Sequence, residues 1–300
     1  MRKTHYYSAL CHSFPLRRIG LLGNGPSPID NVVRSLSVCI VTYFSAPATL
    51  WATLASLERA LLHLHAERGY SAALWIVDNS PQWALPAMPR RIPGQVHTIH
   101  GHGNIGFGRG HNLCLEREDG IGALHLILNP DVELAEDALV AAIDFMESHP
   151  DCVLLSPDAR SGDGARQYLC KRYPSVLDLA LRGFAPTWLK RLFSKRLAGY
   201  EMRERDPAAV FWAAPIVSGC FMMLRGDAFR RLCGFDPRFF LYFEDFDLSL
   251  RAATLGRIAS VPSVRIVHHG GYAARKGWKH VVMFARSGIQ FFNKHGWRLS

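Results

Sequence analysis

Short apolar runs rich in β-branched residues recur along the first half of the chain, and each ends in polar residues. The clearest runs are residues 36–43, 72–77 and 123–128. Between the first two lies the apolar-periodic segment 48–68, which stops at Gly69 as a helix does. Strands that alternate with helices are typical of right-handed βαβ units and a parallel sheet. We therefore expect an α/β fold with a mostly parallel central sheet flanked by helices.

The remaining segments predict more of the same elements, with less regularity after residue 150. Further strands are expected at 96–100, 153–156, 216–224, 258–261 and 264–268, the last two split by Pro262. Helices are expected around 111–117, 135–148, 226–232 and 244–255. Residues 1–34 are rich in glycine, proline and basic residues and show no sustained period, so we treat them as an N-terminal extension.

Composition and charge restrict the partners of the chain. With 49% apolar and 20% charged residues, its 300 residues suit a soluble globular protein. The formal net charge of +10 predicts an anionic partner, such as nucleic acid, acidic lipid or a phosphorylated substrate. The basic pairs are scattered and are not interleaved with aromatic residues, which disfavours nucleic acid.

The cysteines, the N-terminus and the longest uncharged stretch of the chain bear on its cellular compartment. The seven cysteines are odd in number and include no C-x-x-C, which predicts a reducing cytosol without a disulfide framework or zinc ribbon. The N-terminus lacks the apolar core of a signal peptide. The uncharged stretch 207–224 is interrupted by Pro207 and Pro215, so we expect a loop that enters a buried strand rather than a membrane span.

Two acidic motifs follow apolar or aromatic runs. Asn129-Pro130-Asp131 comes after the strand 123–128, and Glu244-Asp245 comes after the aromatic run 239–243. Open α/β sheets bind ligands at the carboxyl ends of their strands. One carboxylate for a metal–diphosphate and another for a base is what sugar transfer from a nucleotide requires. The chain is therefore predicted to be a glycosyltransferase.

An ordered set of motifs extends this interpretation over about residues 36–290. They are VTYFS (41–45), VDNS (77–80), NIGFGRGHN (104–112), LNPDV (128–132), SGCFMMLR (218–225), FDPRFFLYFEDFDLSLR (235–251) and HHGG (268–271). Together they resemble inverting glycosyltransferases of family 2, specifically rhamnosyltransferase-like members with a GT-A fold. The resemblance implies one GT-A domain at 35–300, with a nucleotide-sugar-binding half at 35–132 and a less regular acceptor-binding and catalytic half at 133–300.

The resemblance assigns donor contacts to the first half of the chain. Thr42, Tyr43 and Asp78 would surround the base and ribose, although Asp78 could instead close its strand with an Asx-turn. A second set of contacts lies in the loop and helix at 104–112, where the N–H groups of the helix start could meet phosphate: Asn104, Gly106, Arg109 and Asn112. Asn129, after the fourth strand, is a further donor contact. Arg109 could pair with the diphosphate or simply be solvated.

A divalent cation is implied at Asp131. Its oxygen ligands suit Mg²⁺ or Mn²⁺, which would neutralise the departing diphosphate. Asn129 stands where the broader family carries the first aspartate of D-x-D, so we expect a weaker metal requirement. His268 is the favoured histidine ligand. The alternatives are a strand-ending turn in which Asp131 caps the next helix, and a pair of strand-end histidines without such a role. Four histidines could also suggest zinc, but they lack nearby acidic or cysteine partners: His97, His100, His102 and His111.

The acceptor base is implied at the second acidic motif. Asp245 would take the proton of the attacking hydroxyl, and Glu244 would help to position the acceptor. The alternative is that both acids only favour the start of a helix electrostatically. Asp247 is expected to be structural.

An amphipathic segment suggests where the reaction takes place. Trp188, Leu192 and Leu197 fall on one helical face beside Lys190 and Lys195, which fits either a helix lying on an anionic membrane or one packed on the core. We expect a cytoplasmic protein at the cytoplasmic face of the inner membrane.

The resemblance implies transfer of L-rhamnose from dTDP-β-L-rhamnose, with inversion, to a hydroxyl of O-antigen, lipopolysaccharide core or a similar bacterial cell-surface glycan. UDP-galactofuranose and UDP-N-acetylglucosamine are alternative donors for the same fold. A catalytically silent, membrane-associated module that binds glycans or nucleotide sugars is the alternative of another class.

Overall fold

The computed structural model describes residues 34–82, 91–270 and 277–300. Residues Arg34–Ser300 form one compact unit. The extension predicted for residues 1–34 lies, apart from Arg34, outside the described residues, as does Gly271 of the HHGG motif. The division of the domain at residue 132 stays a prediction.

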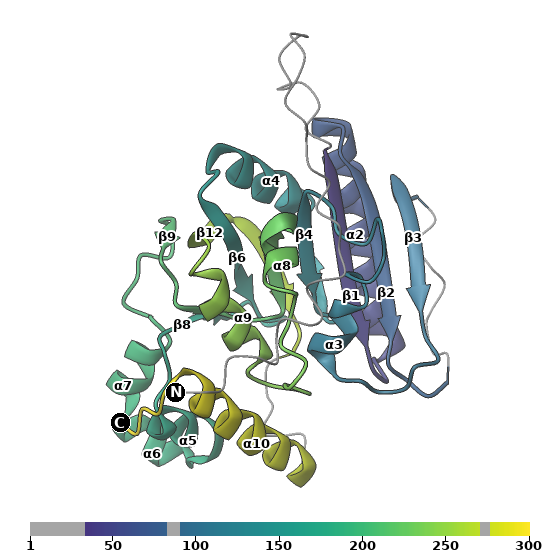
Figure 1. Ribbon diagram of the computed structural model, residues 1–300. Coiled ribbons are helices and arrows are strands. Elements are labelled where there is room, and N and C mark those ends of the chain that lie inside the picture. The colour runs from purple at the N-terminus through teal and green to yellow at the C-terminus, as the bar shows by residue number, and fades with distance from the viewer. Residues whose placement is uncertain (1–33, 83–90, 271–276) are drawn as a thin grey trace, which may run out of the picture. The chain divides into compact units, whose positions relative to one another are not determined.

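One mixed sheet organises the unit, in the strand order β3-β2-β1-β4-β11-β6-β12-β5 (Figure 1). The first four of these strands are parallel, as predicted: β3 (Gly94–Ile99), β2 (Ser71–Asp78), β1 (Ser35–Thr42) and β4 (Leu124–Leu128). Because Thr42 pairs with Asp78 across β1 and β2, the carboxyl ends of these strands form one edge. Thr42 and Asp78, which were predicted from two separate motifs to contact the ligand, therefore lie side by side.

The predicted long strand at 216–224 is two strands in different sheets. β10 (Ile216–Val217) pairs with β8 (Cys170–Lys171), whereas β11 (Phe221–Arg225) runs antiparallel between β4 and β6 (Cys152–Arg160). The break falls at Gly219, whose N–H is donated to the carboxylate of Asp245 instead of to a neighbouring strand. A side chain far along the sequence thus ends the strand.

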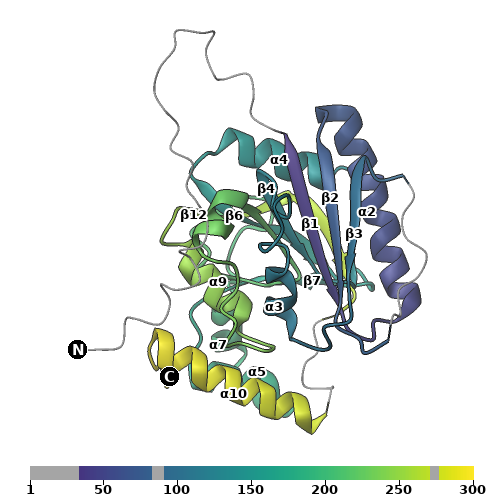
Figure 2. The ribbon, with the colours of Figure 1, turned by 45° about the vertical axis from the view of Figure 1, so that its right-hand side comes forward.

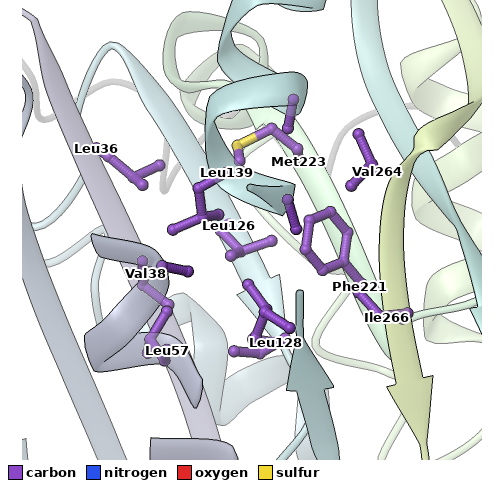
Figure 3. Packing of buried hydrophobic residues seen from close by; sticks show 14 of the residues in the cluster. Leu36, Val38, Leu57, Leu126, Leu128, Leu139, Phe221, Met223, Val264 and Ile266 are labelled. Carbon is purple, nitrogen blue, oxygen red and sulfur yellow. The ribbon is translucent and has the colours of Figure 1, made fainter. Parts of the chain in front are cut away.

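One face of the sheet is covered by α2 (Pro47–Arg68) and α4 (Ala138–Ser148). Alternate strand residues point to this face, among them Val38 and Leu126, and contact Leu57 and Leu139 of the helices, as Figure 3 shows. Phe221 of β11 fills the space between these strands and β12 (Arg257–His268). Such fully buried side chains each contribute about 1.5–3 kcal/mol relative to exposure.

The opposite face carries α3 (Phe107–Asn112), α8 (Gly226–Arg231) and α9 (Glu244–Ala252), which are labelled in Figure 1; Figure 2 shows α3 and α9 from another side. A third cluster joins α9 to α10 (Trp278–His295) through Phe243, Phe291 and Phe292. The same cluster includes Leu179 of α5 (Val176–Phe184). The loop that precedes α9 is held by the face that carries α3, through Phe235, and by this third cluster, through Phe239 and Phe243.

The second half contains several short elements. They are β5 (Val132–Leu134), β7 (Arg166–Gln167), β9 (Phe211–Trp212), α6 (Thr187–Leu192) and α7 (Ser194–Tyr200). β5 was not predicted, and it pairs with the end of β12. β12 itself is continuous across Pro262, contrary to the predicted split, because a shift of register between Val261 and Arg265 accommodates the proline.

Two helix predictions are also corrected. The helix expected at 111–117 is α3, which starts at Phe107 and ends at Asn112, since Gly106 adopts a φ of 91° and turns the chain before it. The amphipathic helix expected across residues 188–197 is broken at Phe193 into α6 and α7. Trp188 and Leu192 are exposed, whereas Leu189 and Leu197 are partly buried.

The cysteines and helices bear on the predicted compartment. Five cysteines carry free thiols: Cys39, Cys114, Cys152, Cys170 and Cys220. Cys233 is disulfide-bonded, which the sequence did not lead us to expect. None of the helices in the described ranges combines the length and apolar character that a membrane crossing requires.

Two buried histidines lie in the face that carries α8. His125 of β4 contacts the Ser37 hydroxyl through Nδ1 at 2.8 Å and stacks on Phe229 with ring centroids 4.7 Å apart. Burial, and then the positive charge of Arg230, lower the pKa of His125 to about 3. Burial, and then His125, lower the pKa of His111 as well.

This burial predicts acid sensitivity. As the pH falls below about 6.5, the unfolded chain takes up a proton that His125 in the folded protein refuses until about pH 3. Its contribution is therefore complete above pH 6.5 and is lost toward pH 3, which amounts to about 2 kcal/mol between pH 7 and pH 5. The variant His125→Phe keeps a ring against Phe229 but cannot titrate. Its free energy of unfolding in urea should therefore fall less between pH 7 and pH 5 than that of wild type. Equal losses in variant and wild type would contradict this assignment.

Candidate active site

Two short hydrogen bonds join the distant acidic motifs at one edge of the sheet. The Asn129 N–H, just beyond β4, donates to the carbonyl of Cys220 at 2.9 Å. The preceding Gly219 N–H donates to Asp245 Oδ2, also at 2.9 Å. Asp131 and Asp245 both raise the pKa of the Cys220 thiol, after burial as the main cause, to about 12. The structure thus brings both acidic motifs to the same place.

Glycine is required where Asp245 meets this edge. A Cβ at Gly219 would lie 3.1 Å from Cβ of Asp245 and 3.5 Å from the ring of Phe107. A Cβ at Gly108 would lie 2.8 Å from Cβ of Phe235 and 3.6 Å from that of Glu244. The glycines of two separate motifs therefore let α3 and β11 approach the start of α9.

The backbone before α9 is held in an uncommon conformation. Tyr242 and Phe243 have φ values of 71° and 66°, which non-glycine residues rarely adopt. Helix α10 holds this loop in place: the Ser287 hydroxyl donates to the carbonyl of Leu241 at 2.8 Å, and Phe243 packs on Phe284 with ring centroids 4.9 Å apart. Backbone held in such regions costs of order 1–3 kcal/mol per residue and clusters at functional sites.

The two acids of the motif have different surroundings. Glu244 is buried, and its Oε2 has no hydrogen-bond partner among the described residues. Burial, and then the charge of Asp245, raise the pKa of Glu244 well above its usual range. Asp245 is partly exposed and accepts from two backbone N–H groups, those of Gly219 and Phe246. Burial raises the pKa of Asp245 as well, but Gly219 and Lys171 oppose the shift.

Sequence reasoning missed Lys171 as part of this site. It is buried in β8, where Ile216 of β10 pairs with it, and β10 leads directly to Gly219. Burial, and then the charge of Arg182, lower the pKa of Lys171 to about 8, while Asp245 and Glu201 raise it. This buried cation opposes the rise in the pKa of Asp245, so Asp245 is the member of the pair that is more favoured in the ionised form.

Asp247 is structural, as expected. It is fully buried and pairs with Arg251, Lys294 and His295, the Arg251 Nε lying 2.7 Å from Oδ2. These bonds fasten α10 to α9.

Asp131 and His268 form a second polar group, across β5 and β12. His268 Nε2 lies 3.5 Å from Asp131 Oδ1. A Cβ at Gly270 would lie 2.2 Å from Asp131 Oδ2 and 3.1 Å from His268 Nε2, so the close approach requires glycine. The neighbouring His269 instead contacts Glu133 at 2.6 Å. Of the two histidines, the structure directs His268 toward Asp131.

Gln167 determines the tautomer of His268. Its amide nitrogen donates to the His268 carbonyl at 2.8 Å, so its Oε1, 2.7 Å from Nδ1, must accept a proton from the ring. In the neutral ring Nε2 then presents a lone pair toward the Asp131 carboxylate. Two acceptors that face each other in this way suit a cation between them, and a ligating histidine held by its other nitrogen is typical of metal sites.

Asp131 and His268 are only a pair. Within the described residues, no group of three or more histidine, cysteine, aspartate or glutamate side chains is arranged to hold a metal ion. The zinc alternative therefore has no support there. A divalent cation at this pair would need water or diphosphate oxygens as its remaining ligands, which is the usual mode of Mg²⁺ with nucleotides.

The predicted base-and-ribose residues lie at the ends of β1 and β2. Thr42 and Asp78 are both buried, and the Thr42 hydroxyl donates to Asp78 Oδ1 at 3.1 Å. The Ser80 N–H donates to the same oxygen at 3.0 Å, so the Asx-turn alternative is also present. Tyr43 is half exposed and packs edge-on against Phe44, 4.8 Å between centroids. An exposed aromatic pair at this edge can stack on a nucleotide base.

Two backbone N–H groups of the glycine-rich loop already have hydrogen-bond partners within the protein. The Gly106 N–H donates to the Asn104 side chain at 3.1 Å, and the Phe107 N–H donates to the carbonyl of Phe240 at 3.0 Å. The expected phosphate contacts at the start of α3 are therefore not supported for these two groups. A Cβ at Gly106 would lie 2.3 Å from the Phe240 carbonyl oxygen, so this glycine brings the loop against residues before α9.

Arg109 and Asn112 also contact the segment before α9. Arg109 Nε donates to the Pro237 carbonyl at 2.7 Å from an exposed position. The Asn112 amide donates to the Phe235 carbonyl at 2.7 Å and accepts from the Phe235 N–H at 2.8 Å. Asn112 therefore holds α3 against this segment, and neither contact tests a role toward the diphosphate.

Several site residues were not identified individually from the sequence. Gly219 and Gly270 belong to motifs that were recognised, so only their tight contacts were missed. Lys171 is one of several scattered basic pairs, and nothing in its neighbours marked it as buried. Gln167 carried no signal, because its role depends entirely on pairing between β6 and β7.

Comparison with known proteins identifies relatives over most of the chain. The profile of the family described as "Glycosyl transferase family 2" matches residues 37–233. The N-acetylglucosaminyl-diphospho-decaprenol L-rhamnosyltransferase of Mycobacterium tuberculosis (strain CDC 1551 / Oshkosh) is 27% identical over 279 residues, covering 87% of this chain and 86% of that protein. Rhamnosyltransferase WbbL of Escherichia coli (strain K12) is 26% identical over 229 residues, covering 73% and 80%.

A solved structure supports the fold. The crystal structure of GalNAc-T7 with UDP, GalNAc and Mn²⁺ superposes with a TM-score of 0.54 at 15% identity. The match covers 88% of this chain and 48% of that one, so this chain spans about half the length of the structure. The likeness, together with the family profile, confirms the predicted GT-A fold.

The site predicts an unusual lysine. Lys171 should titrate near pH 8 in ¹³C NMR spectra of lysine-labelled protein, well below the usual lysine value of about 10.4. Asp245→Asn removes a negative charge that raises the pKa of Lys171, so it should move this titration to lower pH. Lys171→Arg identifies the signal. A Lys171 signal that titrates near the usual value for lysine, or one that does not respond to Asp245→Asn, would contradict the arrangement.

Proposed function

Because the chain belongs to glycosyl transferase family 2, we propose that it transfers L-rhamnose from dTDP-β-L-rhamnose to a hydroxyl of a lipid-linked, cell-surface glycan precursor, with inversion. Two relatives named as rhamnosyltransferases, aligned over 73–87% of the chain, support the sugar. The name of one relative describes a diphospho-decaprenol substrate, which supports a lipid-linked acceptor. The main structural support for the mechanism is the sheet edge where hydrogen bonds bring together Asn129, Gly219 and Asp245.

Asp245 is the proposed base. Inverting transfer needs one group to take the proton of the acceptor hydroxyl as its oxygen attacks the anomeric carbon. Asp245 is partly exposed and is favoured in the ionised form by Gly219 and Lys171. Glu244 is buried and favoured in the neutral form, so its role is to hold the loop and the acceptor side of the site.

Asp131 and His268 are the proposed ligands of a divalent cation. Bound there, Mg²⁺ or Mn²⁺ would supply positive charge to the leaving diphosphate. Asp131 contributes the single carboxylate, Gln167 keeps Nε2 of His268 available, and Asn129 stands where a second carboxylate is expected. We therefore expect a cation requirement weaker than that of a site with two carboxylates.

The remaining predicted residues would hold the nucleotide. Thr42, Tyr43 and Asp78 lie at the ends of adjacent strands, where the base and ribose are proposed to bind. Asn104, Gly106, Arg109 and Asn112 shape the neighbouring loop against the segment before α9. UDP-galactofuranose and UDP-N-acetylglucosamine remain alternative donors, since these residues face the nucleotide rather than the sugar.

A lipid-linked acceptor would place the reaction at a membrane surface. We propose peripheral contact at the cytoplasmic face of the inner membrane, supported by the basic balance of the chain and the exposed Trp188 and Leu192. A silent binding module is the alternative class, and turnover of any nucleotide sugar would exclude it.

Asp245→Asn tests the base. The variant keeps an oxygen for the Gly219 N–H but cannot take a proton, so turnover should fall by at least about 10²-fold while donor binding is retained. Glu244→Gln, nearly the same shape as the neutral acid, should lose far less. The surface variant Asp227→Asn is the matched control. Transfer rates measure turnover, and calorimetric titrations measure donor binding. A larger loss of turnover in Glu244→Gln than in Asp245→Asn would assign the base to Glu244.

Asp131→Ala tests the cation site. The variant should bind Mn²⁺ more weakly in the presence of dTDP. Binding is measured through the electron paramagnetic resonance signal of free Mn²⁺. Gln167→Leu, which frees the ring of His268, should weaken it by about 10–100-fold. Glu133→Gln, which touches only the neighbouring His269, should leave it unchanged. An unaltered Mn²⁺ titration in Asp131→Ala would discard the site.

A further inference from the structure

The outer side of α10 is an apolar stripe without a partner among the described residues. Trp278, Val282, Ala285 and Ile289 recur at helical spacing and are exposed. The exposed fractions are 77% for Trp278, 47% for Val282 and 52% for Ile289. The opposite side of the helix buries Phe291 and Phe292. A helix apolar on both sides needs a second apolar neighbour or a lipid surface.

The exposed aromatic residues of α5 and α6 belong to the same region. Phe184 at the end of α5 contacts Phe284 of α10, with ring centroids 6.3 Å apart. Phe184, Trp188 and Leu192 are each more than half exposed. Figures 1 and 2 show α5 and α10 together below the sheet. The apolar surface therefore extends from α10 over two shorter helices.

The exposed charge of α6, α7 and α10 is positive, and the nearby Asp178, Asp236 and Asp247 are buried in ion pairs. The sequences of α6, α7 and α10 contain no aspartate or glutamate, but they contain lysines and arginines along their length. Lys279 and Arg286 are exposed beside the apolar stripe. Next to Ile289, Arg286 lines a shallow groove together with Arg238 and Lys294. The last two are already paired with the carboxylates of Asp236 and Asp247. Cations around exposed apolar side chains fit the acidic headgroups and acyl chains of a bilayer.

We infer that the outer side of α10, continued by α5 and α6, binds the surface of an anionic lipid bilayer. The apolar side chains enter the headgroup region, and the lysines and arginines pair with lipid phosphates. A protein partner would need a complementary acidic surface, whereas a bilayer supplies both chemistries at once.

Docking at this helix would also bring the acidic motif to the membrane. The inner side of α10 holds the loop before Glu244: Ser287 binds the carbonyl of Leu241, and His280 contacts the Tyr242 hydroxyl at 2.9 Å. One helix thus touches the proposed bilayer on one side and the loop of the proposed base on the other. This use of the surface rests on the proposed function, but the binding itself does not.

Vesicle flotation with the whole 300-residue chain tests the inference. Wild type should float with vesicles of equal phosphatidylglycerol and phosphatidylcholine and should bind vesicles of phosphatidylcholine alone much more weakly. Neutralising two cations in Lys279→Gln/Arg286→Gln should lower affinity for the anionic vesicles by about 30-fold, at roughly 1 kcal/mol per basic residue. Val282→Glu/Ile289→Glu should abolish flotation, and both sites are exposed enough to leave the fold intact.

Leu62→Glu, an exposed leucine on α2, is the matched control and should float like wild type. Wild type that fails to float, a double glutamate variant that still floats, or equal loss in Leu62→Glu would each overturn the inference. Transfer to a soluble acceptor analogue separates the two proposals. It should survive Val282→Glu/Ile289→Glu, and its absence in wild type would count against the proposed function and leave the flotation result standing.

Discussion

The hydrogen bond from the Gly219 N–H to the Asp245 carboxylate is the contact on which the site depends. It ends the strand that would otherwise run through residues 216–224, and it fixes a carboxylate at the sheet edge where the Asn129 N–H meets Cys220. Because β11 lies antiparallel beside β4, residues more than a hundred positions apart along the chain share this edge. Without that antiparallel strand, the two acidic motifs would have no common location.

Charge then distinguishes groups that look alike in sequence. Glu244 and Asp245 are adjacent acids, but burial favours the neutral form of Glu244, while two backbone donors and Lys171 favour the ionised form of Asp245. His268 and His269 are also adjacent, yet Gln167 and Gly270 direct only His268 to Asp131. Pairs of titratable groups with divergent surroundings are a common arrangement in active sites.

The regular part of the fold was predictable because local patterns determine it. Strands β1, β2 and β4 and helix α2 follow from apolar periodicity and from Gly69. Asn129-Pro130-Asp131 could be placed at the ligand edge for the same reason, whereas Glu244-Asp245 reaches it only through the fold. The break at Gly219, the continuous β12 and the burial of Lys171 could not be predicted, since each depends on a partner far along the chain. Helix α10 was not predicted at all, so its exposed outer side was missed with it.

The most direct test of a shared site is an anomalous-scattering map of crystals grown with Mn²⁺ and dTDP. We expect a manganese peak between the Asp131 carboxylate and Nε2 of His268, with the nucleotide across the ends of β1 and β2 and its terminal phosphate turned toward Asp245. Manganese and diphosphate bound away from Asp131, or separated from Asp245 by the sheet, would contradict the account.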